Sequence, residues 1–354
     1  MTMNWLLFFV PITIGLEFLA PERYLLLFVT SSLAILPLAG WMGRATEQLA
    51  ERLGEGIGGL LNATFGNAAE LIIALAALRA GLHDVVKASI AGSIVGNILL
   101  VLGAAMLAGG LRRSEQHFNS AGARSQATML MLAAIALVLP AAFQVAGGTT
   151  AAGLGRLSVS ISVVLLLVYL LYLAFALLTH PALFAGSHVP EEGKAPASPW
   201  WAASVLAVAT SGIAWMSEIL VTAIEPTAHQ LGLSDVFVGV FVVAILGNAA
   251  EHATAITAAL KDRMDLSLSI AIGSSIQVAL FVAPVLVLAS LFLGPAPMNL
   301  AFRAGLVLIV LLSVLITGQV ANDGRSDWLK GTQLLAVYLI LALTFFFLPS
   351  ISPG

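Results

Sequence analysis

The sequence predicts an all-α polytopic membrane protein, and three observations support this fold class. The 354-residue chain is 60% hydrophobic and 9% charged, with a mean hydropathy of +1.02, values that exclude an ordinary soluble domain. Apolar runs long enough to cross a bilayer recur from one end of the chain to the other. The pentapeptide Gly-Asn-Ala-Ala-Glu occurs twice, about half a chain length apart, which indicates a duplicated architecture.

Charged and Pro/Gly-rich breaks divide the chain into about eleven transmembrane helices of roughly 17–25 residues each. We place them at residues 4–20, 23–42, 57–80, 85–110, 122–143, 158–179, 200–222, 235–260, 265–293, 299–317 and 329–348. The longest polar, Pro-rich stretch then lies in the middle, so we interpret it as a linker. The predicted organisation is a leading transmembrane helix at 1–22, a first five-helix repeat at 23–180, a linker at 181–199 and a second five-helix repeat at 200–354.

Five helices per repeat force the second repeat to enter the membrane from the opposite face, which predicts inverted-topology repeats. Ten of the lysines and arginines fall in even-numbered loops and their flanks, and five fall in odd-numbered ones. The positive-inside rule therefore places the even loops, the linker and the N-terminus in the cytoplasm. Because targeting features are absent, we expect the inner membrane of a prokaryote.

The two copies of the pentapeptide each carry one glutamate in an apolar run, Glu70 and Glu251. A carboxylate at membrane depth costs several kcal/mol unless it faces partners or water, so it indicates a functional site. The preceding Gly66-Asn67 and Gly247-Asn248 tolerate non-helical dihedrals, so we expect the helices to open there and release backbone carbonyls. Carbonyls, carboxylates and amides form an all-oxygen ligand set, which suits Ca²⁺ rather than zinc or copper.

A second pair of similar segments follows each pentapeptide. Helical spacing places Ser93 beside Asn97 in the first and Ser274 beside Gln277 in the second. We expect these four side chains to line or gate the ion or proton path. A hydrogen bond between helices is the alternative interpretation of the carboxamides.

Two further polar residues lie in the apolar segments of the second half. Glu218 interrupts a broadly apolar stretch, so we expect it to face the bundle interior as an entrance carboxylate or one just outside the ion's ligands. His252 follows Glu251 directly and faces about 100° away from it on a regular helix. We therefore expect a packing or hydrogen-bonding role for His252.

A two-fold relation between the repeats would bring Glu70 and Glu251 to opposite sides of one cation near the membrane midplane. Two close carboxylates without a cation cannot both stay ionised at low cost, so at least one would take up a proton. Cation binding and protonation then exclude each other. Protons are therefore a chemically sensible counter-substrate for a transported divalent cation.

These motifs resemble those of the calcium/proton antiporters of the cation/calcium exchanger superfamily. The resemblance rests on the segments GNAAELIIALAAL, AGSIVGNILLVLG, SEILVTAIEP, GNAAEHATAI and GSSIQVALFVAP, and it covers the chain from about Arg44 to Pro284. It implies one leading helix plus two inverted five-helix repeats, with Glu70 and Glu251 alternately carrying Ca²⁺ and protons.

Two departures from relatives refine what the resemblance implies. The family often has an acidic stretch in its central cytoplasmic loop, and only Glu191-Glu192 occupies it here, which argues against a regulatory Ca²⁺ site. The sodium-coupled branch carries an acidic residue after the second repeat motif. Gln277 lies in that region of this chain, which favours protons over sodium.

Other function classes fit the sequence less well. A sodium-coupled or other divalent cation exchanger is the main alternative, and a passive cation channel could use the same oxygen ligands. An intramembrane metalloprotease is disfavoured because Ala253 and Thr254 follow Glu251-His252 where its zinc motif requires a histidine. We expect Ca²⁺ and H⁺ as substrates, the lipid bilayer as surroundings, and neither a cofactor nor a nucleic-acid partner.

Overall fold

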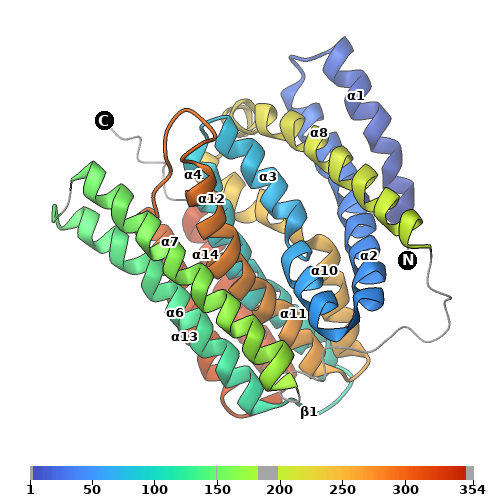
Figure 1. The fold of residues 1–354 in the computed structure, drawn as a ribbon, viewed down its shortest axis with the longest axis vertical. Helices are drawn as coiled ribbons and strands as arrows, with labels where there is room; N and C mark the ends of the chain where they lie inside the picture. Colours follow the sequence, from blue (N-terminus) through green and yellow to red (C-terminus); the bar gives the residue numbers. More distant parts are fainter. Residues whose placement is uncertain (1–2, 149, 182–197, 348–354) are drawn as a thin grey trace. The chain divides into compact units, whose positions relative to one another are not determined.

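The computed structural model describes residues 3–148, 150–181 and 198–347 (Figure 1). The described chain is helical apart from one short β-ribbon, which confirms the all-α prediction. The helices of the first half are η1 (Met3–Phe8), α1 (Phe9–Leu19), α2 (Tyr24–Phe65), α3 (Ala68–Arg79), α4 (His83–Val95), η2 (Gly96–Val101), α5 (Leu102–Gly110), α6 (Ser120–Val145), α7 (Ala151–Ala174) and η3 (Phe175–Thr179). Most of the expected linker, including Glu191 and Glu192, lies outside the described residues.

The second half repeats this series of helices. They are α8 (Pro199–Leu231), α9 (Asp235–Phe237), η6 (Val238–Val243), α10 (Ala244–Leu260), α11 (Met264–Gln277), η7 (Val278–Val282), α12 (Ala283–Ala289), α13 (Ala304–Ala321) and α14 (Trp328–Phe347). The β-ribbon joins β1 (Gln116–His117) to β2 (Arg325–Ser326) in antiparallel register.

The expected count of eleven membrane-spanning helices is not confirmed. In the described part of the chain, eight helices are long and apolar enough to cross a membrane, or nine if Asp235–Ala249 and Glu251–Leu260 count as one broken span. The predicted break between residues 42 and 57 is wrong, because α2 continues to Phe65. Residues 44–53 (RATEQLAERL) are mainly strong helix formers that carry the helix onward, which leaves α3 only 12 residues.

Contacts divide the chain into two compact units, each built from both halves of the sequence. Unit 1 comprises residues 1–89, 191–250 and 348–354, and unit 2 comprises residues 90–190 and 251–347. The units therefore do not coincide with the two predicted repeats. The repeat boundaries at 23–180 and 200–354 stay a prediction.

Unit 1 is built around the paired helices α2 and α8, with α3 packed against α8 and α1 against α2. Two polar contacts help to join these helices. Thr210 on α8 donates to the Met42 sulfur at 3.7 Å, and the Trp215 indole donates to Glu17 on α1 at 3.3 Å. The helices α2 and α8 are the first members of the two predicted repeats, so equivalent helices pair with each other.

The helix pairs of unit 2 follow the same symmetry. Helix α6 packs on α13, α5 packs on α14, and α7 packs on α12. In the predicted repeats α6 corresponds to α13, α5 to α12 and α7 to α14. Exchanging the two repeats therefore converts the pair α5–α14 into the pair α12–α7. The same exchange leaves the pair α6–α13 unchanged. This pattern is the one that two repeats related by a two-fold axis produce.

Two π-helical turns interrupt equivalent helices of unit 2. The first, Gly96–Val101, joins α4 to α5, and the second, Val278–Val282, joins α11 to α12. Such turns release backbone groups from the regular helical ladder and are frequent at functional sites. Each begins beside the carboxamide that the sequence singled out, Asn97 in one case and Gln277 in the other.

Loops that follow the fourth, eighth and tenth predicted spans meet at one end of unit 2. The β-ribbon pairs the loop of Gln116 with that of Arg325. The Gln116 amide donates to Asp262 at 2.8 Å and to the Ala259 carbonyl at 2.9 Å. All three are even-numbered loops, so their contact agrees with the predicted alternation of the chain across the membrane.

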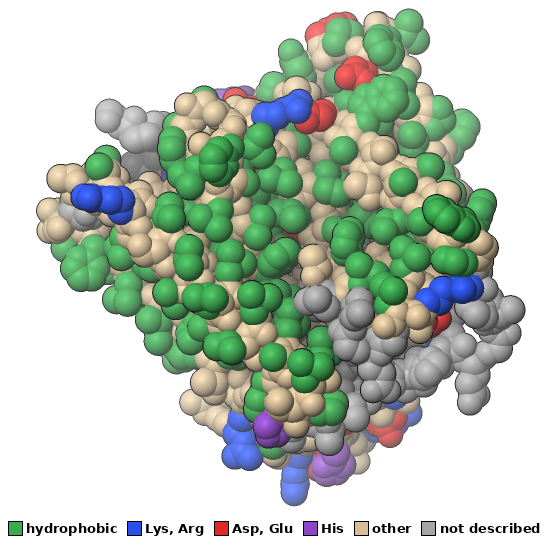
Figure 2. Space-filling model, in the orientation of Figure 1, with side chains coloured by type: hydrophobic (Ala, Val, Ile, Leu, Met, Phe, Trp, Pro, Cys, Tyr) green, Lys and Arg blue, Asp and Glu red, His purple; other side chains and the backbone are tan. Residues whose placement is uncertain are grey.

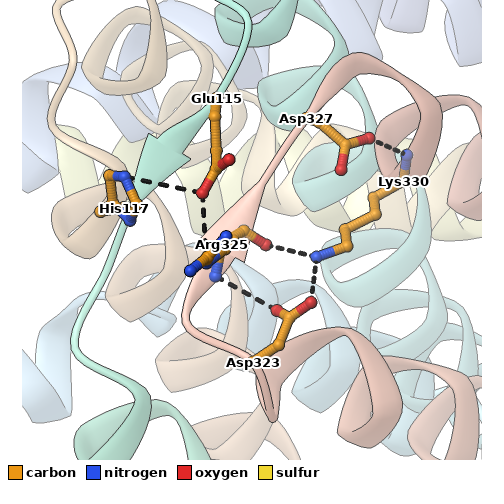
Figure 3. A network of polar contacts seen from close by, with 6 residues as sticks. All are labelled: Glu115, His117, Asp323, Arg325, Asp327 and Lys330. Atoms are coloured by element: carbon orange, nitrogen blue, oxygen red, sulfur yellow. Dashed lines mark hydrogen bonds and ion pairs between the residues drawn. The ribbon is translucent and has the colours of Figure 1, made fainter.

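Charged side chains around this ribbon neutralise one another (Figure 3). Glu115 forms an ion pair of 3.2 Å with Arg325, and Asp323 pairs with Lys330. Desolvation raises the pKa of Asp323, but the hydrogen bonds from Lys330 and from the Arg325 amide and the charge of Lys330 lower it more. The pKa of Asp323 therefore lies below its usual value. These loop carboxylates are therefore already occupied by cationic partners.

The surface of the protein agrees with a lipid environment. On the face drawn in Figure 2, hydrophobic side chains predominate and charged ones are sparse. Large apolar side chains on the outer helices are widely exposed, among them Leu171 at 70% and Ile340 at 61%. Exposed apolar surface on this scale is expected of transmembrane helices rather than of a soluble protein.

Candidate functional site

The first pentapeptide breaks the helix as predicted. Helix α2 ends at Phe65 and α3 begins at Ala68, and Asn67 between them has φ −100° and ψ 20°. Glu70 consequently lies in the first turn of α3, where the positive end of the helix dipole favours a carboxylate. Its side chain is 3% exposed, and that of Asn67 is 1% exposed.

The second pentapeptide also lies at a broken span, because Asp235–Ala249 and Glu251–Leu260 are bent relative to each other. Gly247 and Asn248 themselves remain within helix α10, so the break falls one or two residues after the predicted Gly247-Asn248. Gly247 instead permits close packing, because a Cβ there would lie 3.3 Å from the Cβ of Glu70. The Asn248 amide donates to the Ala244 carbonyl at 3.2 Å and to Glu70 Oε2 at 3.4 Å. Unit 1 therefore joins the Gly-Asn of one copy to the glutamate of the other.

Unit 2 holds Glu251 in a chain of buried hydrogen bonds. The Ser274 hydroxyl bonds to the Glu251 carboxylate, and the Asn97 amide donates to Ser274 Oγ at 3.1 Å. The other end of the Asn97 side chain, Oδ1, lies 3.0 Å from His252 Nε2. Glu251 Oε2 is buried and has no hydrogen-bond partner among the described residues. A carboxylate oxygen in this situation is suited to a cation or a proton.

The other two residues predicted from the second pair of segments, Ser93 and Gln277, lie on the helices α4 and α11 that lead into the π-helical turns. Ser93 is 1% exposed and lies one turn before Asn97. Gln277 is the last residue of α11 and is partly buried beside its π-helical turn. Ser275 was not predicted as a site residue, yet its hydroxyl lies 3.3 Å from the Ile94 carbonyl and joins α11 to α4. In the sequence, only the predicted site residue next to it, Ser274, indicated that Ser275 could matter.

Glu218 does not occupy the interior position that the sequence suggested. Its side chain is 45% exposed, and it forms an ion pair of 2.8 Å with Arg79. Arg79 ends α3 nine residues after Glu70, a rise of about 13 Å along a helix. The long apolar segment around Glu218 predicted burial, but the pairing with Arg79 lets this carboxylate lie at the surface of unit 1.

The polar residues form two groups, one in each unit, whose members are buried except for the partly buried Glu251. Glu70, Asn67 and Asn248 lie in unit 1, while Glu251, Asn97 and Ser274 lie in unit 2. Within the residues that the structure describes, no three histidines, aspartates or glutamates gather as a metal site. A site with one carboxylate per group has few charged ligands and suits a transported ion better than a permanently bound one. That Glu70 and Glu251 share this ion stays a prediction.

Comparison with known proteins shows extensive similarity. The model of the sodium/calcium exchanger protein family matches residues 23–178 and 201–347. The Ca²⁺/H⁺ antiporter of Aphanothece halophytica is 46% identical, over 97% of this chain and 96% of that protein. The Ca²⁺/H⁺ antiporter ChaA of Bacillus subtilis is 44% identical, over 91% of this chain and 92% of that protein.

Solved structures show the same fold. Native YfkE superposes with a TM-score of 0.86 at 41% identity, over 98% of this chain and 100% of that one. The H⁺/Ca²⁺ exchanger CAX superposes with a TM-score of 0.74 over 99% of this chain and 88% of that one. At 16% identity the second match supports the fold alone.

Proposed function

This chain belongs to the sodium/calcium exchanger protein family, and we propose that it is a secondary active antiporter that exchanges Ca²⁺ for H⁺. The single observation that carries the proposal is a duplicated acidic motif whose two glutamates are each held by buried amide or hydroxyl donors. The Ca²⁺/H⁺ antiporter relatives are similar to it over nearly their whole length. We further propose a prokaryotic inner membrane with the N-terminus in the cytoplasm.

The proposed transport site combines the carboxylates of Glu70 and Glu251 with neutral oxygen ligands. Carboxylate, carbonyl and amide oxygens are the ligands that Ca²⁺ prefers. Asn67 and its carbonyl, with that of Gly66, border Glu70 at the break between α2 and α3, while Gly247 and Asn248 hold the side chain of Glu70. In this scheme Ser93, Ser274, Asn97 and Gln277 orient the carboxylates or line the path.

The exchange cycle follows from competition between Ca²⁺ and protons. With the site open to the cytoplasm, the two ionised carboxylates bind Ca²⁺. The repeats then rock, and protons from outside neutralise both carboxylates and release the ion. The protonated site returns more readily than an empty doubly charged one, because moving unpaired charge through a low-dielectric barrier is costly.

Transport in proteoliposomes tests this function. The purified protein should accumulate Ca²⁺ against its gradient when an opposing pH gradient is imposed, and Na⁺ or K⁺ gradients should not replace the pH gradient. The same assay should compare Ca²⁺ with other divalent cations. Accumulation driven by Na⁺ would favour the sodium-coupled alternative, and mere dissipation of a Ca²⁺ gradient would indicate a channel.

Glutamine variants of the two glutamates test the site itself. Glu70→Gln and Glu251→Gln should each abolish uptake driven by the pH gradient, because each removes a carboxylate that the ion and the protons share. Glu225→Gln is the matched control, since Glu225 is exposed on α8, and it should transport normally. Thermal unfolding in detergent checks that all three variants are folded. Near-normal uptake by either of the first two would remove that residue from the mechanism.

A further inference from the structure

A hollow of about 600 Å³ opens at the end of unit 2 where α5 ends and α14 begins. Its lining consists of Gly110, Leu111, Arg112, Arg113, Ser114 and Trp328. The membrane-length apolar helices His83–Gly110 and Trp328–Phe347 terminate at this hollow. It therefore lies at the level where the hydrocarbon core of a membrane gives way to headgroups.

The charge that lines the hollow is positive. Its two charged residues are both arginines, and no carboxylate is among its lining residues. Arg113 is held in place, with Nε 3.4 Å from Asp262 and Nη1 donating to the Leu260 carbonyl at 3.3 Å. Arg112 has no ion pair and no side-chain hydrogen bond in the part of the chain that the structure describes. An unpaired guanidinium beside a hydroxyl, that of Ser114, is suited to a phosphate group.

The nearby carboxylates do not compete for Arg112. Asp262 pairs with Arg113. Glu115 pairs with Arg325, Asp323 pairs with Lys330, and Asp327 accepts from the Lys330 backbone amide (Figure 3). Asp262, Glu115 and Asp323 thus each have a cationic partner, and Asp327 is bonded to a backbone amide. The positive charge of Arg112 is thus available to an anion from outside the protein.

The rim of the hollow is apolar and exposed. Leu111 is 72% exposed, and Trp328 and the adjacent Leu329 are each 50% exposed. Tryptophan at the end of a span is typical of the membrane interface. A free anion would gain nothing from such a rim, whereas the acyl chains of a lipid would cover it.

We propose that this hollow binds the headgroup of an anionic phospholipid. The phosphate contacts the guanidinium of Arg112 and the hydroxyl of Ser114, and the acyl chains lie along Leu111, Trp328 and Leu329. The leaflet is the one that faces the even-numbered loops, which we predict to be cytoplasmic. Basic pockets beside transmembrane helices on that side commonly bind acidic headgroups. The site is separate from the transport site and does not depend on the proposed exchange.

The test compares the thermal unfolding of the full-length protein in detergent with added phosphatidylglycerol, phosphatidylcholine or inorganic phosphate. Phosphatidylglycerol should raise the Tm of the wild type by several degrees more than phosphatidylcholine does. Arg112→Gln should lose at least half of this difference. Arg124→Gln is the matched control and should keep the full difference. Arg124 is exposed near the start of α6, and within the described part of the chain its side chain bonds only to the Ser120 carbonyl.

Several outcomes would overturn the proposal. It fails if the wild type shows no specific rise with phosphatidylglycerol, if Arg112→Gln keeps the full rise, or if Arg124→Gln loses as much. An equal rise with inorganic phosphate alone would show that the hollow takes a free anion and not a lipid. Arg112→Lys guards against misfolding of the glutamine variant, since it keeps the charge and should keep only part of the rise.

Discussion

At the scale of single residues, the site depends on contacts that a sequence pattern only partly indicates. The sequence predicts a helix break at Gly247; the break lies two residues later, after Ala249, and the missing Cβ of Gly247 lets α10 approach Glu70. Asn97 was expected to line a path, and it links Ser274 with His252. Both residues act by fixing where a glutamate lies. Substitutions at these positions should therefore change transport more than they change folding.

Gly247→Ala tests the close approach to Glu70. The new Cβ would lie 3.3 Å from Glu70 Cβ, so the carboxylate must shift by a few tenths of an ångström. We expect the rate of Ca²⁺ uptake to fall several-fold with little change in Tm. Gly273→Ala is the control, since a Cβ there would meet no atom within 4 Å. Equal uptake by the two variants would contradict the prediction.

Ser274→Ala tests the hydrogen bond to Glu251. A hydrogen bond to a charged group contributes about 1.5–3 kcal/mol, and about 1.4 kcal/mol corresponds to a tenfold change in a binding constant. We therefore expect the apparent KM for Ca²⁺ to change by about tenfold or more. The control is Ser313→Ala, because among the described residues the Ser313 hydroxyl bonds only to the Ile309 carbonyl of its own helix. An unchanged KM in Ser274→Ala would assign Ser274 a purely structural role.

At the scale of helices, small residues decide which elements can touch. Helices in a membrane gain little from the hydrophobic effect, so close backbone packing at glycines is a main source of association. Helix α14 meets α5 at Gly331, where a Cβ would overlap the Leu107 backbone nitrogen and lie 2.7 Å from the Gly103 carbonyl. This contact positions the pair α5–α14, which corresponds to α12–α7 in the other repeat.

Gly331→Ala should therefore destabilise unit 2. Overpacking a tight contact typically costs about 1–3 kcal/mol, which exceeds the roughly 1 kcal/mol that alanine gains over glycine within a helix. Thermal unfolding in detergent should show a Tm several degrees below that of the wild type. Gly318→Ala on α13, where a Cβ would meet nothing within 4 Å, should leave the Tm unchanged or raise it. A wild-type Tm in Gly331→Ala would mean that α5 and α14 can separate freely.

At the scale of the whole molecule, topology and orientation follow from the distribution of charge. The even-numbered loops contact one another through the β-ribbon and through Gln116, as alternation requires. The excess of lysine and arginine in these loops predicts that they face the cytoplasm. The alternation of loops between the two sides of the membrane is supported by contacts within unit 2. Which side is cytoplasmic is inferred only from the count of lysines and arginines in the loops.

Single-cysteine labelling tests the orientation, and the chain has no cysteine of its own. Asn322→Cys lies in an even loop and Thr150→Cys in an odd loop, and both positions are exposed. A membrane-impermeant maleimide added outside intact cells should label Thr150→Cys and leave Asn322→Cys unmodified until the cells are opened. The reverse pattern would invert the predicted orientation, and labelling of both from outside would contradict the alternation.

The sequence by itself determined the membrane class, the repeat and the two glutamates, because each depends on local properties. Mean hydropathy, the length of apolar runs and the recurrence of a pentapeptide can be read from the sequence without knowing which residues are in contact. The break after Phe65 was also predictable, since Gly66 and Asn67 carry the tendency to leave a helix in their own dihedral preferences.

Only the tertiary structure decided how the same pentapeptide is used twice. The first copy separates α2 from α3 at Gly66-Asn67. In the second copy Gly247 and Asn248 stay helical and pack on Glu70, and the span breaks only between Ala249 and Glu251. The surface position of Glu218 depends on Arg79, and the environment of Glu251 depends on Asn97, more than 150 positions earlier in the chain. Such partners are brought together by helix packing, and no periodicity along the sequence encodes them.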